Sequence, residues 1–308
     1  MAQITNHIMM IRPANFGFNE ETADNNAFQN SEGKDLANDI SQKAQAEFDN
    51  MVSILRSEGV NVIVVEDTVS PVKPDAIFPN NWISFHQDGS VITYPMYAKN
   101  RRIERREDIV HTLGKEYEVS KRYDFHHYEG DELYLEGTGS MIFDRDNKIV
   151  YACISERTDP TLLEKFSVLM DMKKIAFSSV DRKGFPIYHT NVMMALGKDF
   201  AVICLDSITD SDERELVINT LKTSGKEIVA ISYEQMEQFA GNMLQVSDEA
   251  GNPILVMSQT AYDSLNQDQI AVLESKTQIL PIGIDTIEYY GGGSVRCMMA
   301  EVFLPKKK

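Results

Sequence analysis

Residues 291–303 read GGGSVRCMMAEVF: three glycines, a single cysteine and then an apolar run. The glycines allow positive φ or a close approach to another group, and the apolar run predicts a strand. Cys297 therefore stands where a loop becomes a strand, a place where a scaffold can hold a nucleophile still. Taken alone, such a cysteine is more often a small buried hydrophobic residue, so its meaning depends on the rest of the chain.

One unit recurs along the chain: strand, tight turn, strand, helix, strand. In the first copy, strands at 82–85 and 91–94 flank an Asp-Gly turn that is typical of a β-hairpin, and a helix (101–114) and a strand (117–119) follow. The later copies have hairpins at 140–154, 192–205 and 243–257, helices from Asp159, over 212–223 and over 261–275, and strands at 174–178, 228–231 and 278–282.

The two ends of the chain supply the parts of a fifth unit. A strand at 7–12, a helix at 35–57 whose apolar residues recur from Leu36 to Leu55, and a strand at 60–65 lie before the first copy. A lone strand at 295–303 follows the last copy. Pairing these pieces would close a ring and remove exposed sheet edges. The predicted fold class is therefore α/β, a five-bladed pseudosymmetric α/β-propeller, and we expect residues 1–308 to form a single catalytic domain.

A polar side chain stands at or just before the first strand of each unit: Asn81, Glu136, His189, Asn242 and Cys297. Successive intervals are 55, 53, 53 and 55 residues, and equivalent positions of a closed ring converge near its axis. Thiol, imidazole and carboxylate are the parts of a cysteine-dependent enzyme. We expect Cys297 to be the nucleophile and His189 to transfer protons, while Glu136 orients the histidine or binds substrate nitrogens.

Composition excludes several other classes of function. The net charge of −17 disfavours nucleic acid and anionic membranes as partners, and no segment approaches the roughly 20 apolar residues of a membrane span. Three widely spaced cysteines suit a reducing compartment. We expect a cytoplasmic protein that acts on a small molecule, with both a monomer and a homo-oligomer left open.

Five motifs occur in this order: PDAIFPNN (74–81), LEGTGS (135–140), SERT (155–158), HTN (189–191) and GGSVRC (292–297). Together they resemble the guanidino-group-modifying superfamily of penteins, which includes arginine deiminase, dimethylarginine dimethylaminohydrolase, glycine amidinotransferase and succinylarginine dihydrolase. The resemblance implies a five-fold α/β-propeller, a covalent intermediate on Cys297, His189 as acid and then base, and Glu136 on substrate nitrogens. It implies an amino-acid substrate and neither a metal nor an organic cofactor.

The same resemblance implies how the amino-acid end of a substrate is held. Arg157, in the SERT segment, and Arg101, or failing that Arg102, in the segment RRIE (101–104), match arginines that bind a substrate α-carboxylate. Asp75 matches a residue that contacts the α-amino group. We assign Asn81 and Asn242 to substrate binding as well.

Two departures from the deiminase pattern bear on the substrate. Deiminases have an aspartate where this chain has Asn81, and Glu-Gly-Gly-Asp where it has Glu136-Gly137-Thr138-Gly139. A guanidinium is cationic and favours carboxylates, whereas a neutral ureido group suits an amide, which both accepts and donates hydrogen bonds. The chain thus resembles citrulline hydrolases, and we predict hydrolysis of L-citrulline to L-ornithine, CO2 and ammonia.

Three alternatives stay open at this point. The first is action on a guanidino substrate, as an arginine deiminase, a dimethylarginine hydrolase or an amidinotransferase. The second is a metal hydrolase that uses His126-His127-Tyr128-Glu129-Gly130-Asp131, although adjacent histidines of an extended segment face opposite ways and no spaced ligand set joins them. The third is a ring-shaped binding protein in which Cys297 is dispensable.

Overall fold

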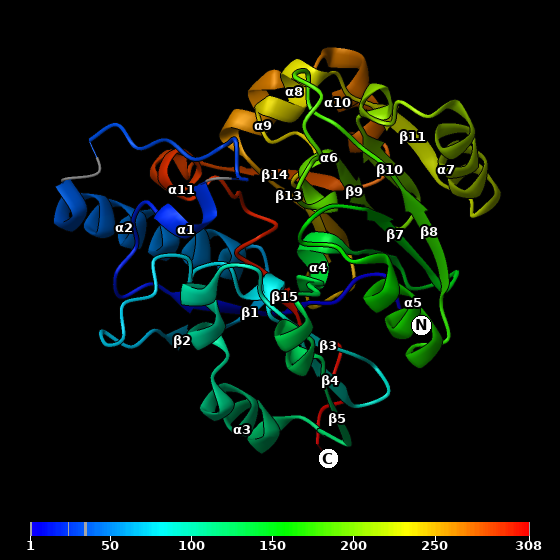
Figure 1. Cartoon of the computed structure of the whole chain (residues 1–308). Coiled ribbons are helices and arrows are strands. Elements are labelled where there is room, and N and C mark those ends of the chain that lie inside the picture. Colours follow the sequence, from blue (N-terminus) through cyan, green and yellow to red (C-terminus); the bar gives the residue numbers. More distant parts are fainter. Residues whose placement is uncertain (1, 24, 34–35, 308) are drawn as a thin grey trace.

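The structure is a computed structural model that describes residues 2–23, 25–33 and 36–307. Within these residues, five separate three-stranded sheets surround a common centre, and the longer helices α2, α3, α5 and α7 lie towards the rim (Figure 1). In every sheet the first strand is antiparallel to the middle strand, and the middle strand is parallel to the third. The predicted propeller of five repeated units is confirmed.

The sheet formed by the two chain ends closes the ring. Its middle strand β1 (His7–Arg12) pairs with β15 (Ala300–Glu301) on one side and with β2 (Asn61–Glu66) on the other. The segment between β1 and β2 holds α1 (Glu20–Ala23) and α2 (Ala37–Ser57). Because the C-terminal strand is held by the N-terminal one, no blade is left with an unpaired first strand in the described chain.

The other four sheets follow in chain order. The first contains β3 (Ile83–Phe85), β4 (Ser90–Thr93) and β5 (Lys121–Asp124), with η3 (Lys99–Glu104) and α3 (Glu107–Glu116) before β5. The second contains β6 (Ile142–Asp144), β7 (Ile149–Cys153) and β8 (Lys173–Phe177), with α5 (Pro160–Leu169) between the last two. The third contains β9 (Met194–Leu196), β10 (Phe200–Ile203) and β11 (Glu227–Ala230), with η5 (Leu205–Ser207) and α7 (Ser211–Thr223). The fourth contains β12 (Leu244–Ser247), β13 (Pro253–Ser258) and β14 (Gln278–Ile282), with α9 (Gln259–Ser264) and α10 (Gln267–Glu274). Additional short helices are η4 (His126–Asp131), α8 (Tyr233–Glu237) and α11 (Asp285–Gly291).

Several predicted boundaries are wrong for local reasons. The helix expected over 101–114 divides into η3 and α3, because Arg105 and Arg106 are extended, and the strand expected at 117–119 forms instead at β5. The helix expected over 261–275 divides at 265–266, where Asn266 caps α10 with a capping box. Leu36 lies outside α2 and is 60% exposed, while the rest of the predicted apolar stripe is buried.

Short helical turns precede the first strands near the axis, and sequence periodicity did not predict them. They are η2 (Pro79–Asn81), α4 (Gly137–Ser140) and α6 (Thr190–Met193). The strand expected over 295–303 is also mostly a turn, since the N–H groups of Cys297, Met298 and Met299 donate to carbonyls three residues earlier. Each turn directs a polar side chain towards the centre. Figure 1 shows α4 and α6 close to the middle of the ring.

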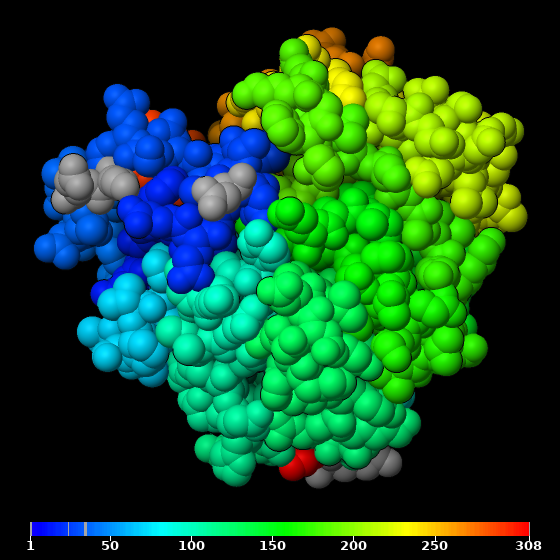
Figure 2. Space-filling view, in the orientation of Figure 1, coloured from blue at the N-terminus to red at the C-terminus, as the bar shows by residue number. Residues whose placement is uncertain are grey.

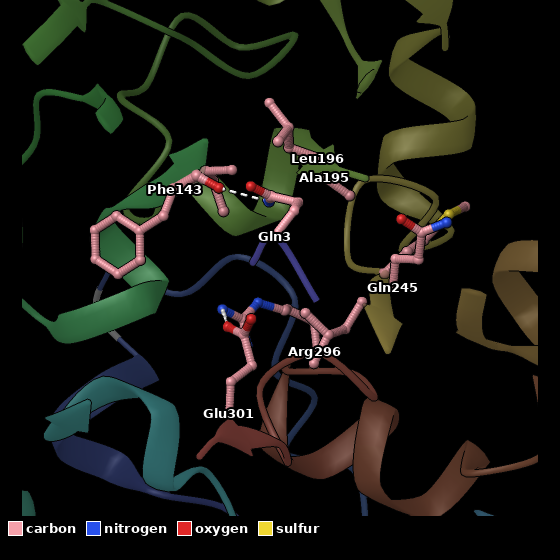
Figure 3. Close-up of a pocket in the computed structure, with 10 residues that line it drawn as sticks. Gln3, Phe143, Ala195, Leu196, Gln245, Arg296 and Glu301 are labelled. Carbon is pink, nitrogen blue, oxygen red and sulfur yellow. Dashed lines mark hydrogen bonds and ion pairs between the residues drawn. The ribbon is translucent and has the colours of Figure 1, made fainter. Parts of the chain in front are cut away.

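A small polar cavity of about 20 Å³ is lined by Gln3 and by residues at the first strands of several blades (Figure 3). The Gln3 side chain donates to the Phe143 carbonyl at 2.9 Å and accepts from the Arg145 N–H at 2.7 Å. Arg296 and Glu301 form an ion pair of 3.1 Å in the same cavity. Its volume is that of a single water molecule, so these contacts close the ring rather than leave an open channel.

Candidate active site

The eight residues predicted for the site are all buried, with exposed fractions of at most 6%. Six of them line one cavity of about 20 Å³: Asp75, Asn81, Arg101, Arg157, His189 and Cys297. Glu136 and Asn242 are not in the cavity wall but contact residues that are, namely His189 and Cys297. The structure therefore brings the five axial residues together from five different blades. Their roles in a reaction stay predictions.

His189 and Glu136 form a tightly coupled pair, with 2.8 Å between His189 Nε2 and Glu136 Oε2. Burial would raise the pKa of Glu136, but Arg157 and His189 outweigh that effect and lower it to about 2. The carboxylate is thus ionised at neutral pH and accepts, so Nε2 of His189 carries the proton. Burial lowers the pKa of His189 and the Glu136 carboxylate raises it by a smaller amount, so the pKa of His189 is lowered to about 4. A neutral imidazole with a free lone pair on Nδ1 is equipped to accept a proton.

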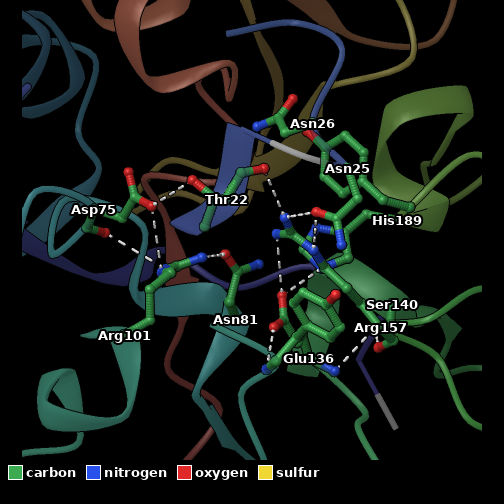
Figure 4. A network of polar contacts seen from close by, with 12 residues as sticks. Thr22, Asn25, Asn26, Asp75, Asn81, Arg101, Glu136, Ser140, Arg157 and His189 are labelled. Carbon is green, nitrogen blue, oxygen red and sulfur yellow. Dashed lines mark hydrogen bonds and ion pairs between the residues drawn. The ribbon is translucent and has the colours of Figure 1, made fainter. Parts of the chain in front are cut away.

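Glu136 has little capacity left for a substrate. Its Oε1 accepts from the Tyr97 N–H at 2.8 Å, and its Oε2 lies 3.6 Å from Arg157 Nη1 as well as against His189. Of the two roles predicted for this carboxylate, the contacts fit orientation of the histidine. Figure 4 shows Glu136 beneath Arg157 in this network.

Arg101 is held by protein groups on nearly every side. Its Nε and Nη2 donate to the two carboxylate oxygens of Glu104, each at 2.9 Å, and its Nη1 donates to Asn81 Oδ1 at 2.8 Å. Burial lowers the pKa of Arg101, but Glu104 and Asp75 outweigh it and the pKa is raised. Arg102, the second choice for a carboxylate ligand, instead donates to the backbone carbonyls of Met96 and Tyr97 and is not among the residues that line this cavity.

The contact with Arg101 fixes the direction of the Asn81 amide. Because the guanidinium only donates, the atom that faces it must be the amide oxygen. The amide nitrogen Nδ2 is buried and has no hydrogen-bond partner among the described residues. A Cβ added to Gly139 would lie 2.5 Å from this nitrogen and 2.8 Å from His189 Nδ1. The asparagine nitrogen and the basic histidine nitrogen therefore both lie against Gly139, and a side chain at position 139 would collide with these two residues of the cavity wall.

Residues 19–23 and 25–29 form a polar N-terminal segment beside the cavity, whose wall includes Thr22 and Asn26. Asp75 accepts from Asn19 Nδ2 at 2.7 Å and from Thr22 Oγ1 at 3.4 Å, and burial raises its pKa. Arg157 donates to the Thr22 carbonyl at 3.3 Å and to Asn25 Oδ1 (Figure 4). In Figure 2 this blue segment abuts the cyan and green surface of the neighbouring blades. This segment therefore contacts Arg157 and one carboxylate oxygen of Asp75, while Asp75 Oδ1 has no hydrogen-bond partner among the described residues.

Sequence reasoning missed Thr22, Asn25 and Asn191. The segment around the first two shows no helix or strand pattern, and its concentration of amide side chains is the signal that the sequence offers. Asn191 stands two residues after His189 in the HTN motif, and its Nδ2 lies 3.3 Å from Cys297 Sγ. Asn242, predicted to bind substrate, is likewise placed with its Nδ2 at 3.3 Å from the sulfur.

Within residues 2–23, 25–33 and 36–307, no three His, Cys, Asp or Glu side chains are arranged to hold a metal ion, those of residues 126–131 included. No helix in that part of the chain has the length and apolar character needed to cross a bilayer.

Five blades around a buried cysteine, histidine and carboxylate define the guanidino-modifying superfamily of penteins, as the sequence motifs predicted. Residues 12–304 match the family described as N,N dimethylarginine dimethylhydrolase, eukaryotic, and the chain belongs to this family. No curated protein matches the chain.

Solved structures share the fold at low sequence identity. The N-terminal domain of ArgZ, covalently bound to a reaction intermediate, is 16% identical with a TM-score of 0.75 over 97% of this chain and 98% of that one. Unliganded AgrE is 18% identical with a TM-score of 0.75, over 98% of this chain and 40% of that one. A dimethylarginine dimethylaminohydrolase adduct with S-methyl-L-thiocitrulline is 14% identical with a TM-score of 0.65, over 97% and 99%. At these identities the likeness is one of fold.

Proposed function

We propose that the protein is a cysteine-dependent hydrolase of the ureido group of L-citrulline, which it converts to L-ornithine, CO2 and ammonia through a covalent Cys297 intermediate. One observation carries this choice of substrate. The Asn81 amide oxygen is held by Arg101, and its unpartnered nitrogen, like His189 Nδ1, lies against Gly139 where both side chains line the cavity.

A donor at this place distinguishes the two substrate classes. A ureido group carries a carbonyl oxygen, which accepts a hydrogen bond and becomes negatively charged when the carbon is attacked. A guanidinium carries only N–H groups. If the Asn81 amide nitrogen faced it, two donors would meet and buried N–H groups would be left without an acceptor, at a cost of about 1–3 kcal/mol. An N–H aimed at a developing oxyanion contributes most in the transition state. Asn81 Nδ2 therefore supports ureido chemistry.

The reaction follows from the protonation states of the site. Cys297 attacks the ureido carbon while its thiol proton passes to the neutral His189, and the carbonyl oxygen accepts from Asn81 Nδ2. His189 then gives the proton to the departing amine, which leaves a thioester-type carbonyl group on the sulfur. Water, deprotonated by the same imidazole, attacks that carbonyl and releases the cysteine together with a carbamic acid, whose remaining C–N bond then breaks to give CO2 and the second amine. One citrulline and one water give one ornithine, one CO2 and one ammonia.

The amino-acid end of citrulline would take over contacts that Asn19, Thr22 and Asn25 now make. Its α-carboxylate would replace the oxygens that face Arg157, and its α-amino group would replace the donors on Asp75. Both are charge-assisted contacts of the kind that select an α-amino acid. With Arg101 engaged by Glu104, Arg157 is the better placed of the two predicted carboxylate ligands.

The rival within the family is a guanidino substrate. The family is described by dimethylarginine hydrolysis, and the structurally similar ArgZ is an arginine dihydrolase from the ornithine-ammonia cycle in cyanobacteria. The carboxylates of the site could favour such a cation. However, Glu136 and Glu104 are already satisfied by arginines and hydrogen bonds.

The test is an amino-acid product assay on citrulline, arginine and dimethylarginine in parallel. We expect ornithine from citrulline, complete loss of turnover in Cys297→Ser, and retained turnover in the control Cys204→Ser, whose thiol is buried away from this cavity. Release of citrulline from arginine, with no ornithine from citrulline, would contradict the substrate assignment. Full turnover by Cys297→Ser would contradict the mechanism.

A further inference from the structure

We propose that Asn191 and Asn242 form a two-amide cradle that stabilises the Cys297 thiolate, which makes Asn191 an additional catalytic residue. The proposal rests on the proposed function only in taking Cys297 as the nucleophile. It does not depend on whether the substrate carries a ureido or a guanidino group.

The geometry around the sulfur is that of an acceptor of two hydrogen bonds. Asn191 Nδ2 and Asn242 Nδ2 each lie 3.3 Å from Cys297 Sγ, and they come from two different blades. The remaining polar contact of the sulfur is Asn242 Oδ1 at 3.8 Å, where a neutral thiol could donate weakly. The backbone N–H of Cys297 donates to the Ser294 carbonyl at 2.9 Å, so the cysteine is fixed in its turn between the amides.

The direction of the Asn242 amide is set by its other partners. Its Oδ1 accepts from the Arg296 N–H at 3.1 Å, and its Nδ2 donates to the Asn191 carbonyl at 3.0 Å. One of the two Nδ2 hydrogens is therefore used by a carbonyl, and the other is free for the sulfur. Asn242 thus binds the backbone of two neighbours of the thiol, Arg296 and Asn191.

Asn191 makes no other side-chain hydrogen bond among the described residues. Its Oδ1 is buried and unpartnered, which is costly for a polar group that contributes only to packing. The Asn191 amide contacts the sulfur through its nitrogen and has no second partner among the described residues. Hydrogen bonding to the sulfur accounts for a polar side chain at this buried position. The HTN motif then carries two functions, a base at 189 and a thiolate donor at 191.

The electrostatic setting makes such donors necessary. Many cysteine enzymes stabilise the thiolate with a protonated histidine, but burial lowers the pKa of His189 to about 4, so the imidazole is neutral at pH 7. Apolar residues surround the cysteine on the core side, among them Val295 and Met298. Two N–H groups can stabilise the negative sulfur during attack, and again when the sulfur leaves the acyl carbon, without a permanent ion pair.

The test measures the rate of Cys297 alkylation by iodoacetamide against pH, without substrate, with the modified residue identified by mass spectrometry. Asn191→Ala removes one donor. Asn191→Asp and Asn242→Asp keep the side-chain shape but replace the amide nitrogen with a carboxylate oxygen. The rim-helix control is Asn219→Asp, which is exposed. We expect no alkylation of Cys153 in the same range, because burial raises its pKa to about 12.

We expect Asn191→Ala to move the alkylation midpoint upward by about one pH unit and to slow alkylation at pH 7 about tenfold, as for loss of one charge-assisted hydrogen bond. The aspartate variants should shift it further, while Asn219→Asp leaves it unchanged. Thermal melting confirms that each variant is folded. Unchanged midpoints in folded Asn191→Ala and Asn191→Asp would overturn the proposal. A shifted midpoint in a protein that does not hydrolyse citrulline would sustain the cradle and reject only the substrate assignment.

Discussion

Replacing Asn81 with aspartate reverses one hydrogen-bonding group of the site while keeping the side chain's size and shape. Arg101 Nη1, at 2.8 Å from Oδ1, can donate to the carboxylate as it does to the amide, so we expect the variant to fold. The atom that now lies beside Gly139 and His189 Nδ1 changes from a donor nitrogen to an acceptor oxygen. The only intended loss is therefore the N–H that faces the substrate.

The size of the effect follows from the role of that N–H. Loss of one donor to a developing oxyanion costs about 3–4 kcal/mol, or about 10²–10³-fold in kcat. The new carboxylate also repels the negatively charged oxygen of the intermediate, so about 10²-fold is the smallest loss we expect with citrulline. A guanidinium gains an acceptor at the same place, so the ratio of arginine to citrulline turnover should rise.

The assay is ornithine release from citrulline and citrulline or ornithine release from arginine, at pH 7, for the wild type, Asn81→Asp and the exposed control Asn219→Asp. Thermal melting shows whether each protein is folded. If folded Asn81→Asp keeps its citrulline kcat/KM within about threefold of the wild type, the nitrogen does not contact the reacting oxygen, since one such donor is worth at least about 10²-fold. The argument for a ureido substrate would then fail.

Three further changes test the surroundings of the site. Gly139→Ala would place a methyl group 2.5–2.8 Å from two polar nitrogens, so Asn81 and His189 must shift. We expect kcat/KM to fall by about 10²-fold or more, as when reacting groups are misplaced. The control Gly130→Ala, whose Cβ meets nothing within 4 Å, should leave kcat/KM unchanged. Because His189 must be neutral to accept the thiol proton and its pKa is about 4, kcat/KM should hold as pH falls through 6.5 and decline only near pH 4; a decline centred at 6.5 would show that burial does not govern this imidazole. Glu104→Gln removes the buried partner of an arginine and should lower the free energy of unfolding in urea by about 3–5 kcal/mol, while Glu107→Gln, in an ion pair whose carboxylate is 79% exposed, should cost less than about 1 kcal/mol.

The fold could be predicted because its signal is repeated. Hairpin turns between short apolar runs recur in every unit, the polar residues before their first strands lie 53–55 residues apart, and an error in an element boundary leaves these intervals intact. The boundaries themselves depend on tertiary contacts. The apolar run from Val295 to Met299 has strand composition, yet it folds as a turn because it must bring Cys297 to the axis. Helical turns such as α4 are too short to show a 3.6-residue period.

The membership of the site could be predicted in part, because equivalent positions of a ring meet at its axis. The ring symmetry does not predict residues that reach the site from irregular segments. Thr22 and Asn25 belong to the connection between β1 and α2, and only the folded chain shows that they contact Asp75 and Arg157. Asn191 lies within a turn whose first residue was predicted, but its direction towards the sulfur depends on how α6 packs.

The identity of a residue does not tell in which direction its side chain makes a hydrogen bond. An asparagine in a sequence is equally a donor and an acceptor, and its neighbours decide which group it offers to a substrate. At position 81 the decision is made by Arg101, which in turn is held by Glu104 three residues further on. The segment RRIE, predicted to bind a carboxylate, therefore supports the proposed specificity in another way: its arginine turns the Asn81 amide so that a donor faces the cavity. At position 242 the backbone N–H of Arg296 makes the corresponding choice for the sulfur. Under the two proposals, amides of the same residue type would serve different partners, an oxygen of the substrate and the thiolate, because different donors hold their oxygens.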